Sequence, residues 1–153
     1  MIVRAVSALA ALPVALWLMY LGGWVFAGLG LGVGAIILYE FMEMTMPRDG
    51  LARLVFVLVG VSLIFFMLTG RLASASSLVA FSALPMLSTT LFLLKTGDMD
   101  TVAQRMGFGV TGVVWAGGLL GATCALRLLD DGFAWIFLAC TLAWGSDTGA
   151  YFV

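Results

Sequence analysis

Asp147 is the residue in this sequence best placed to do chemistry. It is the single charge between Phe133 and Val153, a stretch that is otherwise apolar or small. A carboxylate that follows an apolar run is costly where neither water nor a partner reaches it, so it marks either the membrane surface or a polar cavity. The second alternative would make Asp147 a site residue, with the hydroxyl of Thr148 beside it to orient it.

The composition excludes several kinds of chemistry. The chain has 153 residues and no histidine, so a histidine general base, a Ser-His-Asp triad and a histidine-ligated zinc site are excluded. Cys124 and Cys140 lie in apolar surroundings without a metal or redox spacing, and we expect buried, inert thiols. Any reaction must therefore use carboxylates, hydroxyls, Lys or Arg, or a bound hard cation.

The same composition places the chain in a membrane. It is 63% hydrophobic and 10% charged, whereas soluble domains carry roughly 25% charged residues. A net charge of −1 offers no basic surface for nucleic acid. We therefore expect an all-α polytopic membrane protein, with residues 1–153 forming a single transmembrane domain.

Charged residues and turn residues divide the chain into about six predicted membrane helices. The Gly22-Gly23 step is the expected turn between the first two, because the uncharged run from Arg4 to Glu40 is too long for one crossing. Residues 40–53 are the first predicted polar loop, with its methionines at the membrane interface. The predicted spans are 6–20, 24–39, 54–69, 72–94, 108–126 and 133–146.

Two groups of glycines could be mistaken for nucleotide-binding loops. Gly107-x-Gly109-x-x-Gly112 matches the dinucleotide fingerprint, which has meaning only between a strand and a helix. Here a polar turn precedes it and a predicted span follows. We therefore expect these glycines, and those at 28, 30, 32 and 34, to let helices approach one another closely.

The basic residues predict an orientation. With six spans, five of the seven Lys and Arg fall on one side, and Arg71 and Arg127 fall on the other. Because basic residues accumulate in cytoplasmic loops, both ends of the chain are expected in the cytoplasm.

The segment around Asp147 resembles a known family. The pattern Trp144-x-x-Asp147-Thr148-x-Ala150-Tyr151 is similar to a segment of the phosphatidate cytidylyltransferases, also called CDP-diacylglycerol synthases. Leu38-Tyr39-Glu40-Phe41 resembles the close of that family's second membrane helix. Family members continue beyond this point, so we expect the chain to be the N-terminal part of a larger enzyme, and incomplete or inactive by itself.

The resemblance implies an activity, a site and a location. CTP and phosphatidate would be converted to CDP-diacylglycerol and pyrophosphate in phospholipid biosynthesis at the inner membrane. Asp147 would be catalytic and would hold Mg²⁺, Thr148 would assist it, and Tyr151 would be an interfacial or packing aromatic. We expect the lipid bilayer as a partner, no nucleic acid, and allow for a homodimer. The alternative is a non-catalytic polytopic membrane protein, such as a transporter subunit or an assembly factor.

Overall fold

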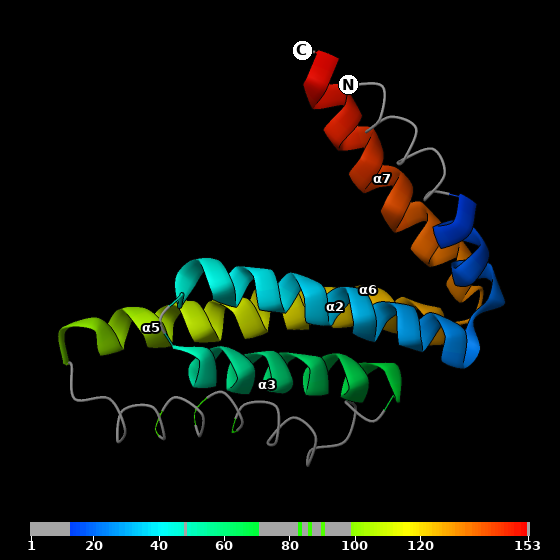
Figure 1. Cartoon of the computed structure of the whole chain (residues 1–153). Helices are drawn as coiled ribbons and strands as arrows, with labels where there is room; N and C mark the ends of the chain where they lie inside the picture. Colours follow the sequence, from blue (N-terminus) through cyan, green and yellow to red (C-terminus); the bar gives the residue numbers. More distant parts are fainter. Residues whose placement is uncertain are drawn as a thin grey trace.

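The structure of the chain, a computed structural model, describes residues 13–47, 49–70, 83, 86, 90 and 99–152. Within these ranges every regular element is a helix and no strand occurs, so the all-α prediction is confirmed. After helical residues 13–21 the elements are α2 (Gly23–Thr45), α3 (Gly50–Leu68), α5 (Met99–Gly112), the π-helix η2 (Val113–Leu119), α6 (Leu120–Ala125), the 3-10 turn η3 (Leu126–Leu128) and α7 (Gly132–Phe152) (Figure 1).

Three helices in the described ranges are long and apolar enough to cross a membrane. They are Gly23–Thr45, Gly50–Leu68 and Val102–Leu128, and they overlap the predicted spans 24–39, 54–69 and 108–126. Residues 6–20 and 133–146 coincide in part with helical residues 13–21 and with α7. The span 72–94 lies outside the described residues apart from 83, 86 and 90, so the count of six spans stays a prediction.

The predicted turn at Gly22-Gly23 is confirmed, and its cause is backbone geometry. Gly22 and Gly23 have φ angles of 64° and 54°, in the left-handed region that glycine enters without the steric cost of a β-carbon. Gly22 is also pressed against another part of the chain, because a β-carbon there would lie 2.5 Å from Nη2 of Arg127.

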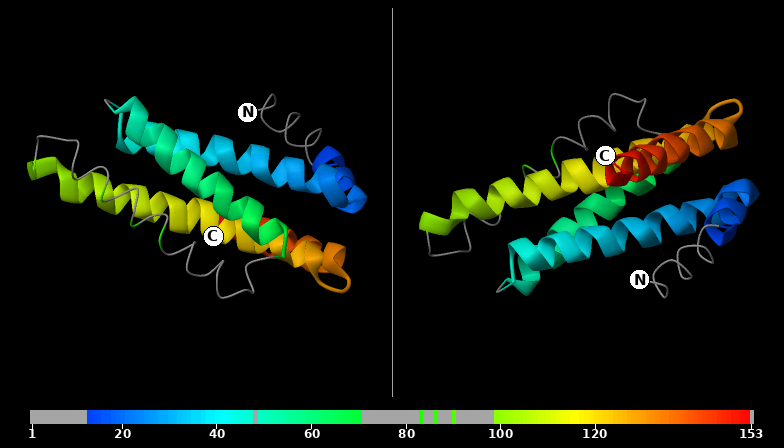
Figure 2. Two further views of the ribbon diagram at one scale, coloured as in Figure 1. Left: turned by 90° about the horizontal axis from the view of Figure 1, so that it is seen from below. Right: turned by 90° about the horizontal axis from the view of Figure 1, so that it is seen from above.

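Glycines set how the three long helices pack. A β-carbon added at Gly34 of α2 would meet the side chain of Ile64 in α3, and one added at Gly60 of α3 would meet Leu38 of α2. The pairings run in opposite directions along the two chains, so α2 and α3 are antiparallel. Figures 1 and 2 show the helix from α5 to α6 as the third neighbouring rod of this bundle.

The predicted role of the Gly107-x-Gly109-x-x-Gly112 run is confirmed at two of its three positions. A β-carbon at Gly109 would collide with the ring of Phe56, and one at Gly112 would lie 2.5 Å from Met42. Nothing lies within 4 Å of the corresponding position at Gly107. The run lies inside α5, whose residues 99–106 precede it as helix, so it packs helices and does not cradle a dinucleotide.

The core of the bundle consists of large side chains between these close approaches. Phe56, Leu38, Met42 and Ile64 are fully buried, with 1% or less of their surface exposed. In a bilayer, lipid tails solvate apolar side chains as well as protein does, so such a core is held mainly by close van der Waals packing. Small residues opposite large ones provide that fit.

The polar loop predicted over residues 40–53 is wrong in its bounds. Glu40 and Glu43 lie inside α2, Arg53 lies inside α3, and only residues 46–49 connect the two helices. Helix α2 continues past Tyr39 because its last turns remain amphipathic, with Met42 buried and Glu43 exposed. The side chain of Asp49 then caps α3 by accepting a hydrogen bond from the backbone nitrogen of Ala52, at 3.2 Å.

The methionines of this segment do not lie at the interface as a group. Met42 and Met46 are 0% and 3% exposed and belong to the core with Phe56, whereas Met44 is 76% exposed. Positions 42 and 46 share a face because residues four apart in a helix are neighbours. The prediction treats the methionines as one alternating stretch, whereas the residues that share a face of this helix are four positions apart.

Helix α7 leaves the end of the bundle and runs alongside residues 13–21 (Figure 1). Its first turns are packed. Ile136 is buried with Phe26 and Cys124, and the rings of Phe133 and Tyr20 meet edge to face at 5.6 Å. Every residue from 141 to 150 is exposed.

Candidate functional site

Asp147 lies in the second half of α7, on the exposed part of that helix. Residues 144, 146 and 148 around it are exposed as well. Among the described residues, no hydrogen bond or ion pair joins the Asp147 carboxylate to another group. Within the part of the chain that the structure describes, the carboxylate is thus open to a cation or a ligand and has no second acid paired with it.

The oxygen ligands of this segment fit one mode of binding Mg²⁺, in which the protein supplies a single carboxylate. The described ranges hold no group of three or more acidic, histidine or cysteine side chains that could form a complete ligand set. Mg²⁺ is commonly held by one or two carboxylates, while waters and substrate phosphates fill its remaining positions. A single accessible carboxylate such as Asp147 fits that mode.

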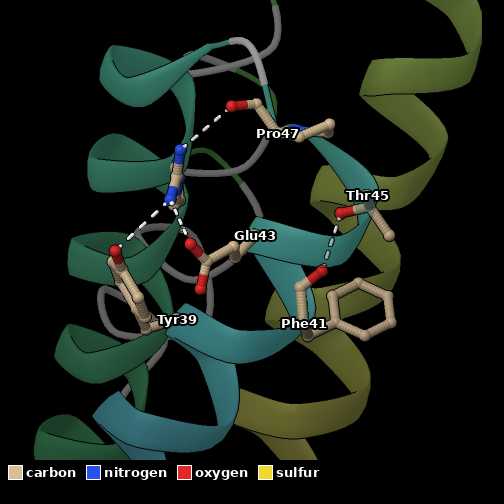
Figure 3. A network of polar contacts seen from close by, with 6 residues as sticks. Tyr39, Phe41, Glu43, Thr45 and Pro47 are labelled. Carbon is tan, nitrogen blue, oxygen red and sulfur yellow. Dashed lines mark hydrogen bonds and ion pairs between the residues drawn. The ribbon is translucent and has the colours of Figure 1, made fainter.

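A cluster of polar side chains, which we call the Arg53 cluster, joins the end of α2 to the start of α3. Arg53 donates from Nη1 to the Tyr39 hydroxyl and to Oε1 of Glu43, each at 3.3 Å (Figure 3). From Nη2 it donates to the backbone carbonyl of Pro47, also at 3.3 Å. Its guanidinium carbon lies 5.4 Å from the centre of the Tyr39 ring, within range of a cation–π contact.

The geometry of the Arg53 cluster indicates a structural role. Arg53 meets one acceptor on each of three residues, so one side chain ties two helices and their connecting turn together. Its side chain is only 15% exposed, whereas that of Glu43 is 55% exposed. An ion pair with one partner in water contributes roughly 0–1 kcal/mol, so the hydrogen bonds matter more than the charge.

A second ion pair connects this corner to the third helix. Arg105 of α5 lies 3.5 Å from the Asp49 carboxylate, measured from Nη1 to Oδ2. Asp49 therefore caps α3 with one oxygen and pairs with α5 through the other. Arg53 and Arg105 are therefore both engaged within the chain.

Sequence reasoning found the acid in α7 but not the Arg53 cluster. The resemblance of Leu38-Tyr39-Glu40-Phe41 to the family groups Tyr39 with Glu40, yet the structure gives the two side chains different surroundings. Tyr39 belongs to the cluster, whereas Glu40 is exposed, and no hydrogen bond or ion pair joins its side chain to another described residue. Tyr39 and Arg53 are far apart in sequence, and no local spacing indicates their contact.

Comparison with known proteins decides the family. The family model described as "Cytidylyltransferase family" matches residues 2–153, which is nearly the whole chain. The chain belongs to the cytidylyltransferase family. The resemblance in the segment around Asp147 is thereby confirmed at the level of the family.

A curated relative of this chain is the phosphatidate cytidylyltransferase of Bacillus subtilis (strain 168). The two are 29% identical over 158 residues, an alignment that covers 98% of this chain and 56% of the relative. The chain therefore spans little more than half the length of that relative. No solved structure matches the chain.

Proposed function

We propose that this chain forms the N-terminal membrane part of a phosphatidate cytidylyltransferase. The observation that carries the proposal is the family match over residues 2–153, which includes the three long apolar helices and the segment around Asp147. The similarity to the Bacillus subtilis phosphatidate cytidylyltransferase supports phosphatidate as the lipid substrate and CTP as the nucleotide.

In the proposed reaction, a phosphate oxygen of phosphatidate attacks the α-phosphorus of CTP. The bond that forms is the new P–O bond of CDP-diacylglycerol. The bond that breaks joins the α-phosphorus to the oxygen bridging it to the β-phosphate, so pyrophosphate leaves with the electron pair. This reaction gathers negative charge at one point, and catalysis of such transfers depends mostly on positioning and on neutralising that charge.

Asp147 is the proposed catalytic residue of this part of the enzyme. Mg²⁺, when bound, neutralises phosphate charge and favours attack at phosphorus. Asp147 would hold it through a carboxylate oxygen, and the Thr148 hydroxyl would orient that carboxylate. The exposure of residues 141–150 supports this role, because a carboxylate on an open helix can be reached by a nucleotide and by the rest of the enzyme.

The location proposed for this enzyme is the inner membrane, with both ends of the segment in the cytoplasm. Arg53 and Arg105 lie at one end of the bundle and Arg127 lies at the other, and a basic excess is typical of the cytoplasmic side. A homodimer belongs to the proposal as well, and α7, with Leu138 and Leu142 exposed at 48% and 64%, is the helix whose surface is open to a second copy.

The test is incorporation of labelled CTP into lipid by the complete protein in detergent. We expect labelled lipid to form only when phosphatidate and a divalent cation are supplied. The Bacillus subtilis relative, assayed in parallel, shows that the assay works. If the relative forms labelled lipid and this protein forms none, the proposal fails in favour of a non-catalytic membrane protein.

A further inference from the structure

A cavity lies at the end of the bundle opposite the Arg53 cluster. It has a volume of about 600 Å³ and is bounded by the start of α2, the end of α3 and η3, a size that suits a small-molecule ligand. Its walls are apolar: Phe26 and Leu31 come from α2, Phe65 and Leu68 from α3, and Leu128 from η3. Its polar side chains are Thr69 and Arg127.

Arg127 has donors to spare. Its Nε donates to the backbone carbonyl of Met19 at 3.4 Å, which fixes the side chain beside Gly22. A guanidinium has five N–H donors, and no ion pair joins Arg127 to an acid among the described residues. Asp130 and Asp131 follow closely in sequence without pairing with it. The half-buried Arg127 therefore presents to the cavity a positive charge that no acid of the described ranges pairs with.

The Thr69 hydroxyl does not offer its proton to a ligand in the cavity. Its hydroxyl donates to the backbone carbonyl of Phe66 at 2.9 Å. Arg127 is thus the group that would bind an anion in this cavity.

Aromatic side chains place the cavity at the level of a membrane interface. Trp17, Tyr20 and Trp24 are 62%, 68% and 84% exposed and cluster near the start of α2, and Trp and Tyr are typical of the lipid headgroup region. Helix α2 has 23 residues, or about 34 Å at 1.5 Å per residue, close to the thickness of a bilayer. The cavity extends from this interface along α2 toward Leu31, in the apolar interior.

We propose that this cavity binds one anionic phospholipid of the surrounding bilayer. The phosphate lies on Arg127, and one acyl chain lies in the groove between α2 and α3. A guanidinium binds phosphate oxygens through charge-assisted hydrogen bonds, and basic pockets between membrane helices are suited to lipid headgroups. The unpaired charge of Arg127 favours a lipid with net negative charge over a zwitterionic one.

This site is separate from Asp147 and does not depend on the proposed enzyme activity. Helix α7 starts near the cavity and carries Asp147 roughly 22 Å further along its axis. The lipid would instead hold together the ends of three bundle helices. The acyl chain would fill the space that the side chains of α2 and α3 leave between these two helices.

Two glycines of α2 allow a matched test. Gly28 lines the cavity and Gly32 does not, and a β-carbon would meet nothing within 4 Å at either position. Gly28→Leu places a side chain in the cavity, whereas Gly32→Leu places the same side chain on the same helix outside it. Both changes are expected to leave the bundle folded.

The measurement is native mass spectrometry of the complete protein released from micelles that contain dioleoylphosphatidylglycerol. We expect one lipid to be retained by the wild type and by Gly32→Leu. Gly28→Leu should lower the apparent affinity by about 10-fold, and Arg127→Gln should lower it by a similar factor, because a charge-assisted hydrogen bond is lost. Arg127→Lys should retain part of the binding, since it keeps the charge without the planar guanidinium.

Several outcomes would overturn the inference. Equal loss in Gly28→Leu and Gly32→Leu would indicate lipid bound generally to the surface of α2. Competition by inorganic phosphate at millimolar concentration would indicate a site for soluble anions. Retention of phosphatidate without phosphatidylglycerol would make the cavity part of a substrate path. A dimer that dissociates in Gly28→Leu would indicate that a second copy of the chain fills it.

Discussion

A β-carbon added to Gly117 of η2 would lie 3.1 Å from the α-carbon and from the carbonyl oxygen of Gly60 in α3. The two backbones meet with no side chain between them. The same contact coincides with the π-helical stretch Val113–Leu119, where the helix from α5 to α6 departs from α-helical hydrogen bonding. Since Gly60 also packs against Leu38 of α2, all three long helices meet at this level.

We therefore expect Gly117→Ala to destabilise the bundle. The obstructing atoms are backbone atoms, which cannot rotate away, so α3 would have to shift, at a cost of about 1–3 kcal/mol. Gly107→Ala is the matched control in the same continuous helix, because a β-carbon there meets nothing within 4 Å. The control should gain up to about 1 kcal/mol, since alanine favours helix. Unfolding in mixed detergent micelles measures both, and equal effects at the two sites would contradict the Gly60–Gly117 contact.

The sequence predicted that glycines would allow helices to approach, but not which glycines would do so. Gly30 and Gly34 pack against Cys124 and Ile64, whereas Gly28 and Gly32 on the same helix face open space. Both pairs have the same spacing. The choice between them depends on where α3 and α6 lie, which is a tertiary property and not a local one.

The ends of α2 were predictable to different degrees. The start at Gly23 follows from two adjacent glycines, whose positive φ angles local sequence can indicate. The sequence predicts an end at Tyr39, because Glu40 and Glu43 indicate a polar loop, whereas the helix continues to Thr45. The charge of Glu43 is tolerated within the span of α2 because Arg53 of α3 donates a hydrogen bond to it. That contact links residues distant in sequence.

The candidate site was predictable only as a residue. The family resemblance singled out Asp147, and the family is confirmed. Among the described residues, no hydrogen bond or ion pair joins its carboxylate to another group, and contacts of that kind depend on how helices pack and not on local sequence. The Arg53 cluster is not predictable from local sequence either, because its contacts join residues of two different helices.

Loss of the Arg53 side chain should weaken the joint between α2 and α3. Arg53→Ala removes three hydrogen bonds and a cation–π contact, and we expect a loss of about 1–3 kcal/mol in the free energy of unfolding. Glu43→Gln is the control, because it removes the charge and keeps an acceptor. It should cost less than about 1 kcal/mol, as for an ion pair half in water.

Arg53→Ala also separates a structural role from a binding role in the proposed enzyme. If Arg53 holds α2 to α3, Arg53→Ala should lower thermal stability while the KM for CTP changes by less than about threefold, equivalent to under 1 kcal/mol. A large rise in KM at unchanged stability would instead place Arg53 in the nucleotide site.

The two ends of the bundle should lie on opposite sides of the membrane. Met44 is 76% exposed near the end of α2, and Asp130 is exposed in the turn after η3. In a background of Cys124→Ala and Cys140→Ala, an impermeant maleimide applied to intact cells should label Asp130→Cys. It should label Met44→Cys only after permeabilisation. Labelling of both from outside would contradict a bundle that spans the bilayer, and the cysteine-free background is the control.

Replacing Asp147 tests the proposed site. Asp147→Asn keeps the side-chain volume and removes the charge. If the carboxylate holds a cation or meets phosphate charge in the transition state, the variant should lose most of that stabilisation. We expect turnover of the complete enzyme to fall by about 10²- to 10³-fold, the range typical for losing one electrostatic contact made in the transition state. Because the carboxylate is exposed and has no hydrogen bond or ion pair to another described residue, the thermal stability should not change.

Asp130→Asn is the matched control for this replacement. Asp130 is also exposed, but it lies in the turn before α7, at the far end of that helix from Asp147. The turnover of Asp130→Asn should stay within about threefold of wild type when membrane expression is matched. This corresponds to a change in the activation barrier of under about 1 kcal/mol. If Asp147→Asn also stays within that range, its carboxylate is a solvated acid on an exposed helix. The family assignment would then stand, since it rests on residues 2–153 as a whole, but the catalytic group would have to be sought elsewhere in the enzyme.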